Sequence, residues 1–464
     1  MRSDWREATL GEISQNISRP FDFDECDDVV FINTGDVLEG KFLHSNRVSK
    51  IGLPGQAKKR IKKGDILFSE IRPANKRYAL VDFDPINYVV STKFMVIKQL
   101  SNDVDSRFFY LLLTNYMSLN EFQRIAESRS GTFPQITFDA ISYFPVKLPP
   151  FPEQKAIARV IGALDDKIEL NRQMNETLES MAQALFKSWF VDFDPVIDNA
   201  LAAGNPIPDA LKPKAAQRAE QLKAAAQRGE APSAHRELFP AEFTYTEELG
   251  WIPKGWKVTQ IGEIAKVTKG KSYKSSELSE SKTALVTLKS FKRGGGYRLD
   301  GLKEYTGAYK QEQEVRVGDL VIAYTDVTQA ADVIGKPAMV IDDARYDHLV
   351  ISLDVAVVRP KIDAHKYFLY NLAHTSNFQN HTRSYSTGTT VLHLSKNAVP
   401  DYTFCLPEEG TLSSYIGIVE PLFSSINKNI GQMRNLEKLR DTLLPKLLSG
   451  ELRVAEAAAL VEGV

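Results

Sequence analysis

A spacing of apolar residues that occurs twice, 258 positions apart, constrains the fold of this 464-residue chain more than any other feature. Within residues 151–190 the apolar residues follow one another in steps of three and four, apart from Asn171 and Asn175, and this spacing lines one face of a long helix. The predicted seam consists of Ile157, Ile161, Leu164, Ile168, Asn171, Leu178, Met181 and Leu185. We therefore expect a coiled-coil helix over residues 151–190.

The same seam occurs again near the C-terminus. It consists of Val419, Leu422, Ile426, Asn429, Leu436, Leu439 and Leu443. Its asparagine falls at the same place as that of the first seam, since 429 − 171 = 258. A buried Asn–Asn pair fixes the register of a coiled coil at some loss of stability. The alternative is two unrelated amphipathic helices, but the shared polar position favours a duplicated gene whose two long helices pack on each other.

The remaining sequence repeats more loosely. WREATLGEI at residues 5–13 recurs as WKVTQIGEI at residues 256–264, and each copy opens a region of short β-like runs and helical stretches. The offset grows within these regions and is constant within the helices. A fixed scaffold that carries two diverging modules is expected if the modules recognise different targets, although neutral drift of loops gives the same pattern.

These repeats predict an α+β chain with an internal pseudo-repeat. Residues 191–250, rich in Ala and Pro, are expected to be a surface linker with a short helix near residues 215–227, and the last residues are expected to be frayed. The predicted order is a first α+β domain, a central helix, a linker, a second α+β domain, a C-terminal helix and a tail, over residues 1–150, 151–190, 191–250, 251–409, 410–450 and 451–464.

Composition narrows the class of protein. A chain of this length needs two or three domains rather than one core. The two cysteines, Cys26 and Cys405, lie far apart and form no CxxC, which excludes a disulfide framework or a structural zinc site and suits the cytoplasm. No run approaches the roughly 20 apolar residues of a membrane span. The net charge of −1 argues against a protein that holds nucleic acid by overall charge alone, but not against local basic clusters.

No catalytic constellation is found. Residues 270–272 (GKS) resemble the end of a phosphate-binding loop, but Ala265 stands where that loop needs glycine. Residues 148–151 (LPPF) have an apolar residue where an amino-methyltransferase needs an amine acceptor. His374 and His381 are interpreted as a pair on a helix surface rather than a metal site. We therefore expect no catalysis, no metal site and no cofactor in this chain.

Basic and polar residues cluster at matching places in both repeats. Those of the first repeat are Lys58, Lys59, Arg60, Lys62, Ser69, Arg72, Asn75, Lys76, Arg77, Arg129, Thr132 and Gln135. Those of the second repeat are Lys289, Lys292, Arg293, Tyr297, Arg298, Thr325, Asp326, Gln329, Thr389 and Thr390. Lys and Arg bind phosphates, while Arg, Asn, Gln and carboxylates recognise base edges. Each residue alone is equally consistent with a solvated surface, but their recurrence favours contacts with DNA.

Four stretches match a known family. They read PPFPEQKAIARVIGALDDKIELNRQMNETLESMAQALFKSWFVDFDP, LGWIPKGWKVTQIGEI, GTTVLHLSKNAV and LEKLRDTLLPKLLSGEL. Through them the chain resembles the specificity subunit of type I restriction–modification systems over nearly its whole length. The second long helix departs from the first at its start, where EEGTLSSYI stands in place of PEQKAIARV, so the two helix starts are not expected to contact partners identically.

The resemblance implies two target-recognition domains with twisted β-sheets, separated by two long antiparallel coiled-coil helices. Each domain would recognise one half of an asymmetric, bipartite site in double-stranded DNA. A helix of about 36 residues spans roughly 54 Å, enough to separate two half-sites. By resemblance the chain is non-catalytic: two modification subunits bring S-adenosylmethionine, and restriction (motor-nuclease) subunits bring ATP and Mg²⁺. Two alternatives stay open, a self-sufficient methyltransferase or nuclease and a protein–protein scaffold without a DNA role.

Overall fold

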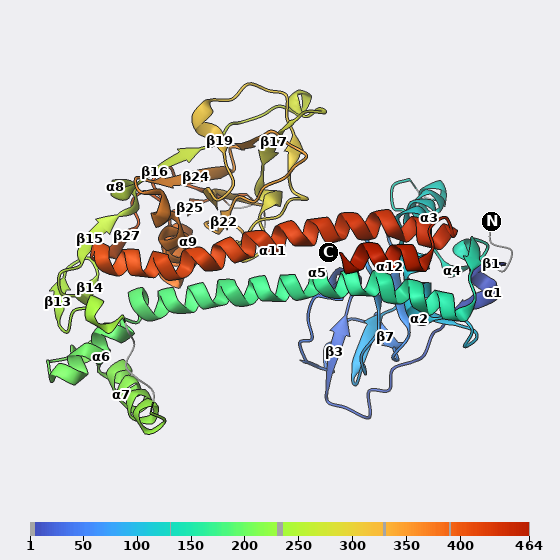
Figure 1. Cartoon of the computed structure of the whole chain (residues 1–464), viewed down its shortest axis with the longest axis horizontal. Coiled ribbons are helices and arrows are strands. Elements are labelled where there is room, and N and C mark those ends of the chain that lie inside the picture. The colour runs from blue at the N-terminus through green and yellow to red at the C-terminus, as the bar shows by residue number, and fades with distance from the viewer. Residues whose placement is uncertain (1–4, 130, 230–234, 328–330, 389–390, 464) are drawn as a thin grey trace. The chain divides into compact units, whose positions relative to one another are not determined.

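The computed structural model describes residues 5–129, 131–229, 235–327, 331–388 and 391–463 (Figure 1). The chain forms two compact units, one from Met1–Arg172 with Gly431–Val464 and one from Gln173–Ile430. Two long helices, α5 (Phe151–Phe186) and α11 (Glu409–Ser449), each contribute to both units. Each unit therefore combines one α+β domain with part of each long helix.

Two four-stranded sheets form the domain of the first unit. One has the order β2 (Ser14–Asn16), β11 (Phe94–Gln99), β8 (Ile66–Ser69) and β9 (Tyr78–Leu80), and the other β6 (Val48–Ser49), β3 (Asp28–Ile32), β10 (Tyr88–Ser91) and β7 (Ala57–Arg60). Strand β10 is parallel to β3, and all other pairs are antiparallel. Helices α2 (Ser106–Thr114) and α3 (Tyr116–Arg129) share a core with the first of these sheets and with α5 and α11.

The second unit repeats this topology strand for strand. Its sheets have the orders β16 (Ala265–Lys269), β24 (Val355–Pro360), β20 (Leu320–Ala323), β22 (Pro337–Met339) and β18 (Lys303–Glu304), β17 (Thr283–Val286), β23 (His348–Ile351), β19 (Glu314–Val315). The parallel pair recurs as β17 with β23. In each unit the opening strand, β1 (Arg6–Thr9) or β15 (Lys257–Gln260), pairs with the strand before a long helix, β12 (Pro145–Leu148) or β27 (Thr403–Leu406). The predicted α+β class and pseudo-repeat are confirmed.

The long helices are antiparallel within each unit. In the first unit Asp165 pairs with Arg440 and Asn171 Nδ2 lies 3.3 Å from Gln432 Oε1. In the second, Asn429 Nδ2 donates to Asn175 Oδ1 at 2.8 Å. The two asparagines that share a seam position, 171 and 429, are thus not bonded to each other. An antiparallel register places a different partner opposite each of them.

Most predicted seam residues are withdrawn from solvent. The structure buries Ile157, Ile161, Leu164, Asn171, Val419, Leu436 and Leu443, and half-buries Ile168, Leu178, Leu185, Leu422, Ile426, Asn429 and Leu439. Met181 is a correction, because its side chain is 53% exposed and Ala182 takes the buried place. Strict alternation of steps of four and three after Leu178 reaches Ala182, whose small side chain carries a weaker apolar signal than Met181.

The segment predicted as a surface linker is largely structured. It contains α6 (Asp194–Ala203), α7 (Lys212–Gln227) and the hairpin of β13 (Phe243–Thr246) and β14 (Gly250–Pro253). Helix α6 buries Val196, Ile197 and Ala200. The prolines that indicated a linker stand in the first turns of α6 and α7, where a missing N–H costs little.

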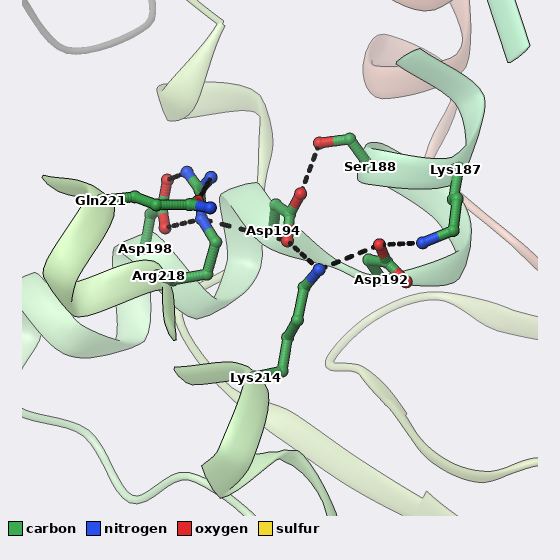
Figure 2. Close-up of polar contacts among 8 residues, drawn as sticks. All are labelled: Lys187, Ser188, Asp192, Asp194, Asp198, Lys214, Arg218 and Gln221. Atoms are coloured by element: carbon green, nitrogen blue, oxygen red, sulfur yellow. Dashed lines mark hydrogen bonds and ion pairs between the residues drawn. The ribbon is translucent and has the colours of Figure 1, made fainter. Parts of the chain in front are cut away.

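Ion pairs attach α7 to α6 and to the end of α5 (Figure 2). Lys214 Nζ lies 3.0 Å from Asp192 and 3.5 Å from Asp194, and Arg218 Nε donates to Asp198 Oδ1 at 2.9 Å. The C-terminal tail is also ordered, against the expectation of fraying. Residues Val454–Glu462 form α12, which buries Ala457 in the core of the first unit.

Candidate nucleic-acid interface

In the first unit the loop that follows β8 has an unusual backbone. A 3-10 turn over Pro73–Asn75 is flanked by Arg72 (φ 43°) and Lys76 (φ 54°), both in the left-handed region. Side chains other than glycine adopt this conformation at some cost, and such residues gather at functional sites when the surroundings hold them. Here the Ala74 amide donates to Gln123 Oε1 at 3.0 Å. The loop is therefore fixed in a strained shape.

A second loop, which follows α3, is attached to the first. Ile71 and Gln135 form a β-bridge, and the Ile136 amide donates to the Glu70 carbonyl at 2.8 Å. Arg72 makes two further bonds, from its amide to the Pro134 carbonyl at 3.1 Å and from Nη2 to the Thr132 carbonyl at 3.3 Å. The structure thus brings together residues that the sequence separates by about 60 positions. The exposed members of this cluster are Arg72, Asn75, Lys76, Arg129 and Thr132, with Gln135 half-buried.

The second unit has the same two loops. They form a small sheet of β21 (Thr325–Asp326), β26 (Leu392–Leu394) and β25 (Ser386–Thr387). Thr325 pairs with His393, and the Leu394 amide donates to the Tyr324 carbonyl at 2.8 Å, as in the first unit. His393 therefore stands where the first unit has Gln135, and its Nδ1 lies 3.2 Å from Thr325 Oγ1. Sequence analysis missed His393, although the offset of 258 from Gln135 would have found it.

Several predicted contact residues are instead buried parts of the scaffold. Asp326 accepts hydrogen bonds from the amides of Val333 and Ile334 at 2.7 and 3.1 Å, and its burial excludes direct contact with a ligand. Tyr297, Ser69 and Thr325 are corrected in the same way, because all three are buried. Tightly packed loops need polar groups to satisfy their own backbone, and such residue types are the same as those that contact bases.

Two predicted cations also serve the scaffold. Lys59 Nζ donates to the Phe94 carbonyl at 2.6 Å, and burial lowers the pKa of this lysine. Arg77 Nη1 donates to the carbonyls of Gly35 and Val37 at 3.0 and 2.9 Å. On β7, an edge strand in which Lys59 alternates with its neighbours, Lys58 and Arg60 are exposed.

The remaining cations lie on the surface. Lys62, Lys289, Lys292, Arg293 and Arg298 are exposed. Arg298 is hydrogen-bonded to Asp300, which raises the pKa of the arginine, and Lys76 Nζ lies 2.6 Å from Glu39. Gln329, Thr389 and Thr390 lie outside the described residues, so their predicted roles stay predictions.

Potential catalytic groups were sought in the part of the chain that the structure describes. No group of three or more His, Cys, Asp or Glu residues there is placed to hold a metal ion. His374 and His381 are not a surface pair: they lie on α9 (Lys366–His374) and α10 (Ser376–Ser384), and burial lowers the pKa of His374 to about 4. No described helix has the length and apolar character needed to cross a membrane.

A cavity of about 740 Å³ in the second unit is lined by charged residues. Its charges largely neutralise one another. Arg359 Nη2 lies 2.7 Å from Asp319 Oδ2, and Lys366 Nζ lies 2.6 Å from Asp363 Oδ2. The cavity therefore presents paired side chains rather than a set of groups that converge on a ligand.

The fold and the two loop clusters define a duplicated α+β protein that presents two related polar surfaces with different side chains. The chain belongs to the family of type I restriction modification DNA specificity domains, whose model matches residues 2–180 and 253–429. It is 36% identical to the type I restriction enzyme HindI specificity subunit of Haemophilus influenzae, over 97% of this chain and 100% of that protein.

Two further similarities extend this result. The MjaIX specificity subunit of Methanocaldococcus jannaschii is 27% identical over 80% of this chain and 76% of its own length. The crystal structure of the S subunit of a type I restriction–modification system from M. genitalium matches with 15% identity and a TM-score of 0.48, covering 96% of both chains.

Proposed function

We propose that this chain is the subunit of a type I restriction–modification enzyme that recognises a two-part sequence in double-stranded DNA. The observation that carries the proposal is the pair of joined loops that occurs once in each unit. The shared hydrogen bonds, Ile136 to Glu70 and Leu394 to Tyr324, make the loops equivalent, while the side chains at the joined positions differ. Equivalent frames with different side chains suit recognition of two different half-sites, and hence an asymmetric target.

The exposed cations support a division of labour. Lys58 and Arg60 on β7, and Lys292 and Arg293 in the second unit, are suited to phosphate contacts, which position a protein on DNA without selecting a sequence. The loop side chains around Arg72, Gln135 and His393 are suited to contacts with base edges. A net charge of −1 is compatible with this arrangement because partner subunits can supply the remaining positive charge.

Catalysis belongs, in this proposal, to other subunits. Two modification subunits would bind S-adenosylmethionine and methylate the DNA, and restriction (motor-nuclease) subunits would use ATP and Mg²⁺. The absence of a metal-binding group among the described residues supports this division. The proposed location is the cytoplasm, where such a complex meets DNA.

Methylation mapping tests the proposal. Chromosomal DNA from cells that express the modification subunit with and without this chain is compared by single-molecule sequencing. New methylation that requires the chain and falls on a two-part sequence with a constant gap is expected. Methylation that does not depend on the chain would contradict the proposal, as would binding of S-adenosylmethionine by the isolated chain. A protein–protein scaffold without a DNA role would form a complex but give no new methylation.

A further inference from the structure

An apolar side chain is exposed at the same place in both units. Phe133 is 50% exposed and Val391 is 36% exposed. Phe133 lies two residues before Gln135, which is bridged to Ile71, and Val391 lies two residues before His393, which pairs with Thr325. The two apolar residues are therefore structurally equivalent.

The backbone on both sides of Phe133 is fixed by one arginine. Arg72 bonds the Thr132 carbonyl through its guanidinium and the Pro134 carbonyl through its amide. Val391 is held in a similar way at one side, because Leu392 pairs with Asp326. A single exposed apolar residue is ordinary on a protein surface. Two at equivalent, anchored positions, each beside exposed polar groups of a proposed DNA surface, indicate a shared contact.

The chemistry common to phenylalanine and valine is apolar surface, and only one of them has an aromatic ring. A stacking contact with bases is therefore not the shared property. Side chains that wedge between base steps are longer, such as Phe, Leu, Ile and Met, and valine is not among them. The apolar feature that a base pair presents in the major groove is the C5-methyl group of thymine, which apolar side chains contact.

We propose that Phe133 and Val391 are specificity-determining residues, each of which contacts the C5-methyl group of a thymine in the half-site bound by its own unit. This inference rests on the proposed function. It assigns each half-site at least one A·T pair, recognised by its methyl group, beside the base edges that Gln135 and His393 recognise. Because Phe133 offers a larger apolar surface, its contact excludes more water than that of Val391.

Deoxyuridine, which lacks the C5-methyl group, tests the contact. The complex of the chain with its modification subunits is titrated with duplexes that carry the mapped target, in which one thymine at a time is replaced by deoxyuridine. For one thymine in each half-site, the wild-type complex is expected to lose roughly fourfold in affinity, the value of one buried methyl group. Phe133→Ala should bind the thymine and deoxyuridine duplexes of its half-site equally, whereas Phe133→Leu should keep part of the discrimination.

Matched variants define the contrary results. Val391→Thr, which keeps the shape but replaces a methyl group by a hydroxyl, should abolish discrimination in the other half-site only. Leu100→Ala removes an equally exposed side chain, 50%, beyond the far end of β11, and should discriminate like the wild type. The inference is overturned if no deoxyuridine weakens wild-type binding, if Phe133→Ala still discriminates, or if Phe133→Ala instead abolishes DNA kinking.

The same titration separates this inference from the proposed function. If the wild-type complex does not prefer the mapped target to random DNA, the proposed function is contradicted and the inference fails with it. If the preference is present but independent of thymine methyl groups, only the inference fails.

Discussion

Asn175 and Asn429 are hydrogen-bonded across the two long helices, with 2.8 Å between Oδ1 of the first and Nδ2 of the second. Both side chains are half-buried between otherwise apolar neighbours. A polar pair in such a seam opposes shifts of register, because any shift leaves an amide without its partner. This pair therefore fixes how α5 and α11 are aligned in the second unit.

A double-mutant cycle measures the pair. Asn429→Ala and Asn175→Ala should each lower the unfolding free energy by about 1 kcal/mol, and the double variant should lose less than the sum of the two, with a coupling of roughly 0.5–1.5 kcal/mol. Denaturant unfolding followed by circular dichroism gives these values. Strictly additive losses would show that the bond does not contribute to stability.

The stability of the second unit should depend on the charge of His374. Its ring is buried against Tyr370, at 4.7 Å between centroids, and Nε2 lies 4.0 Å from Glu179 Oε1. Burial, aided by the charge of Lys336, lowers the pKa of His374 to about 4, whereas an unfolded histidine titrates near 6.5. The unfolded state thus binds the proton more tightly, so stability is complete above pH 6.5 and falls as the pH drops towards 4.

The expected loss across this window is about 3 kcal/mol, to order of magnitude. His374→Phe keeps the ring contact and removes the proton site, so its unfolding free energy should change less between pH 6.5 and 4. Urea unfolding at several pH values provides the measurement. Parallel pH profiles for the wild type and His374→Phe would contradict the buried, neutral state of this histidine.

Arg72 should contribute to sequence selectivity. Arg72→Ala is expected to weaken binding to the target by about 1–3 kcal/mol and binding to random DNA by less, because the loop beside Gln135 loses both its guanidinium and the bond to Thr132. Arg124→Ala is the matched control, since Arg124 is exposed and paired with Glu121 on α3. Equal losses on target and random DNA would assign Arg72 to phosphate contacts.

The exposed cations of β7 should act differently. Lys58→Ala and Arg60→Ala are expected to weaken binding to all duplexes alike and to reduce the slope of log affinity against log salt concentration by about 1 each. Fluorescence anisotropy over a range of salt concentrations measures this slope. An unchanged slope would place these residues away from the DNA.

Much of the fold was accessible from the sequence, because apolar spacing along a helix is a direct record of burial. The two long helices and the duplication followed from the offset of 258 alone. Met181 and the supposed linker were misjudged because the sequence does not show which neighbour is close enough to bury a small residue such as Ala182, or that Pro195 and Pro213 begin helices.

The candidate site was accessible only in outline. Sequence located the loops around Arg72 and Thr325, but residue type cannot distinguish an aspartate that faces solvent from one that, like Asp326, binds its own backbone. The joining of Ile71 to Gln135, and of Thr325 to His393, depends on how the loops fold together, which no local pattern records.

The central claim is that each unit recognises its own half of the target. Methylation mapping of cells that express the modification subunit with the wild-type chain, Gln135→Ala or His393→Ala tests it most directly. The account predicts that Gln135→Ala relaxes the sequence of one half-site, that His393→Ala relaxes the other, and that the gap between them is unchanged. Relaxation of the same half-site by both variants, or an identical methylation pattern in all three strains, would contradict it.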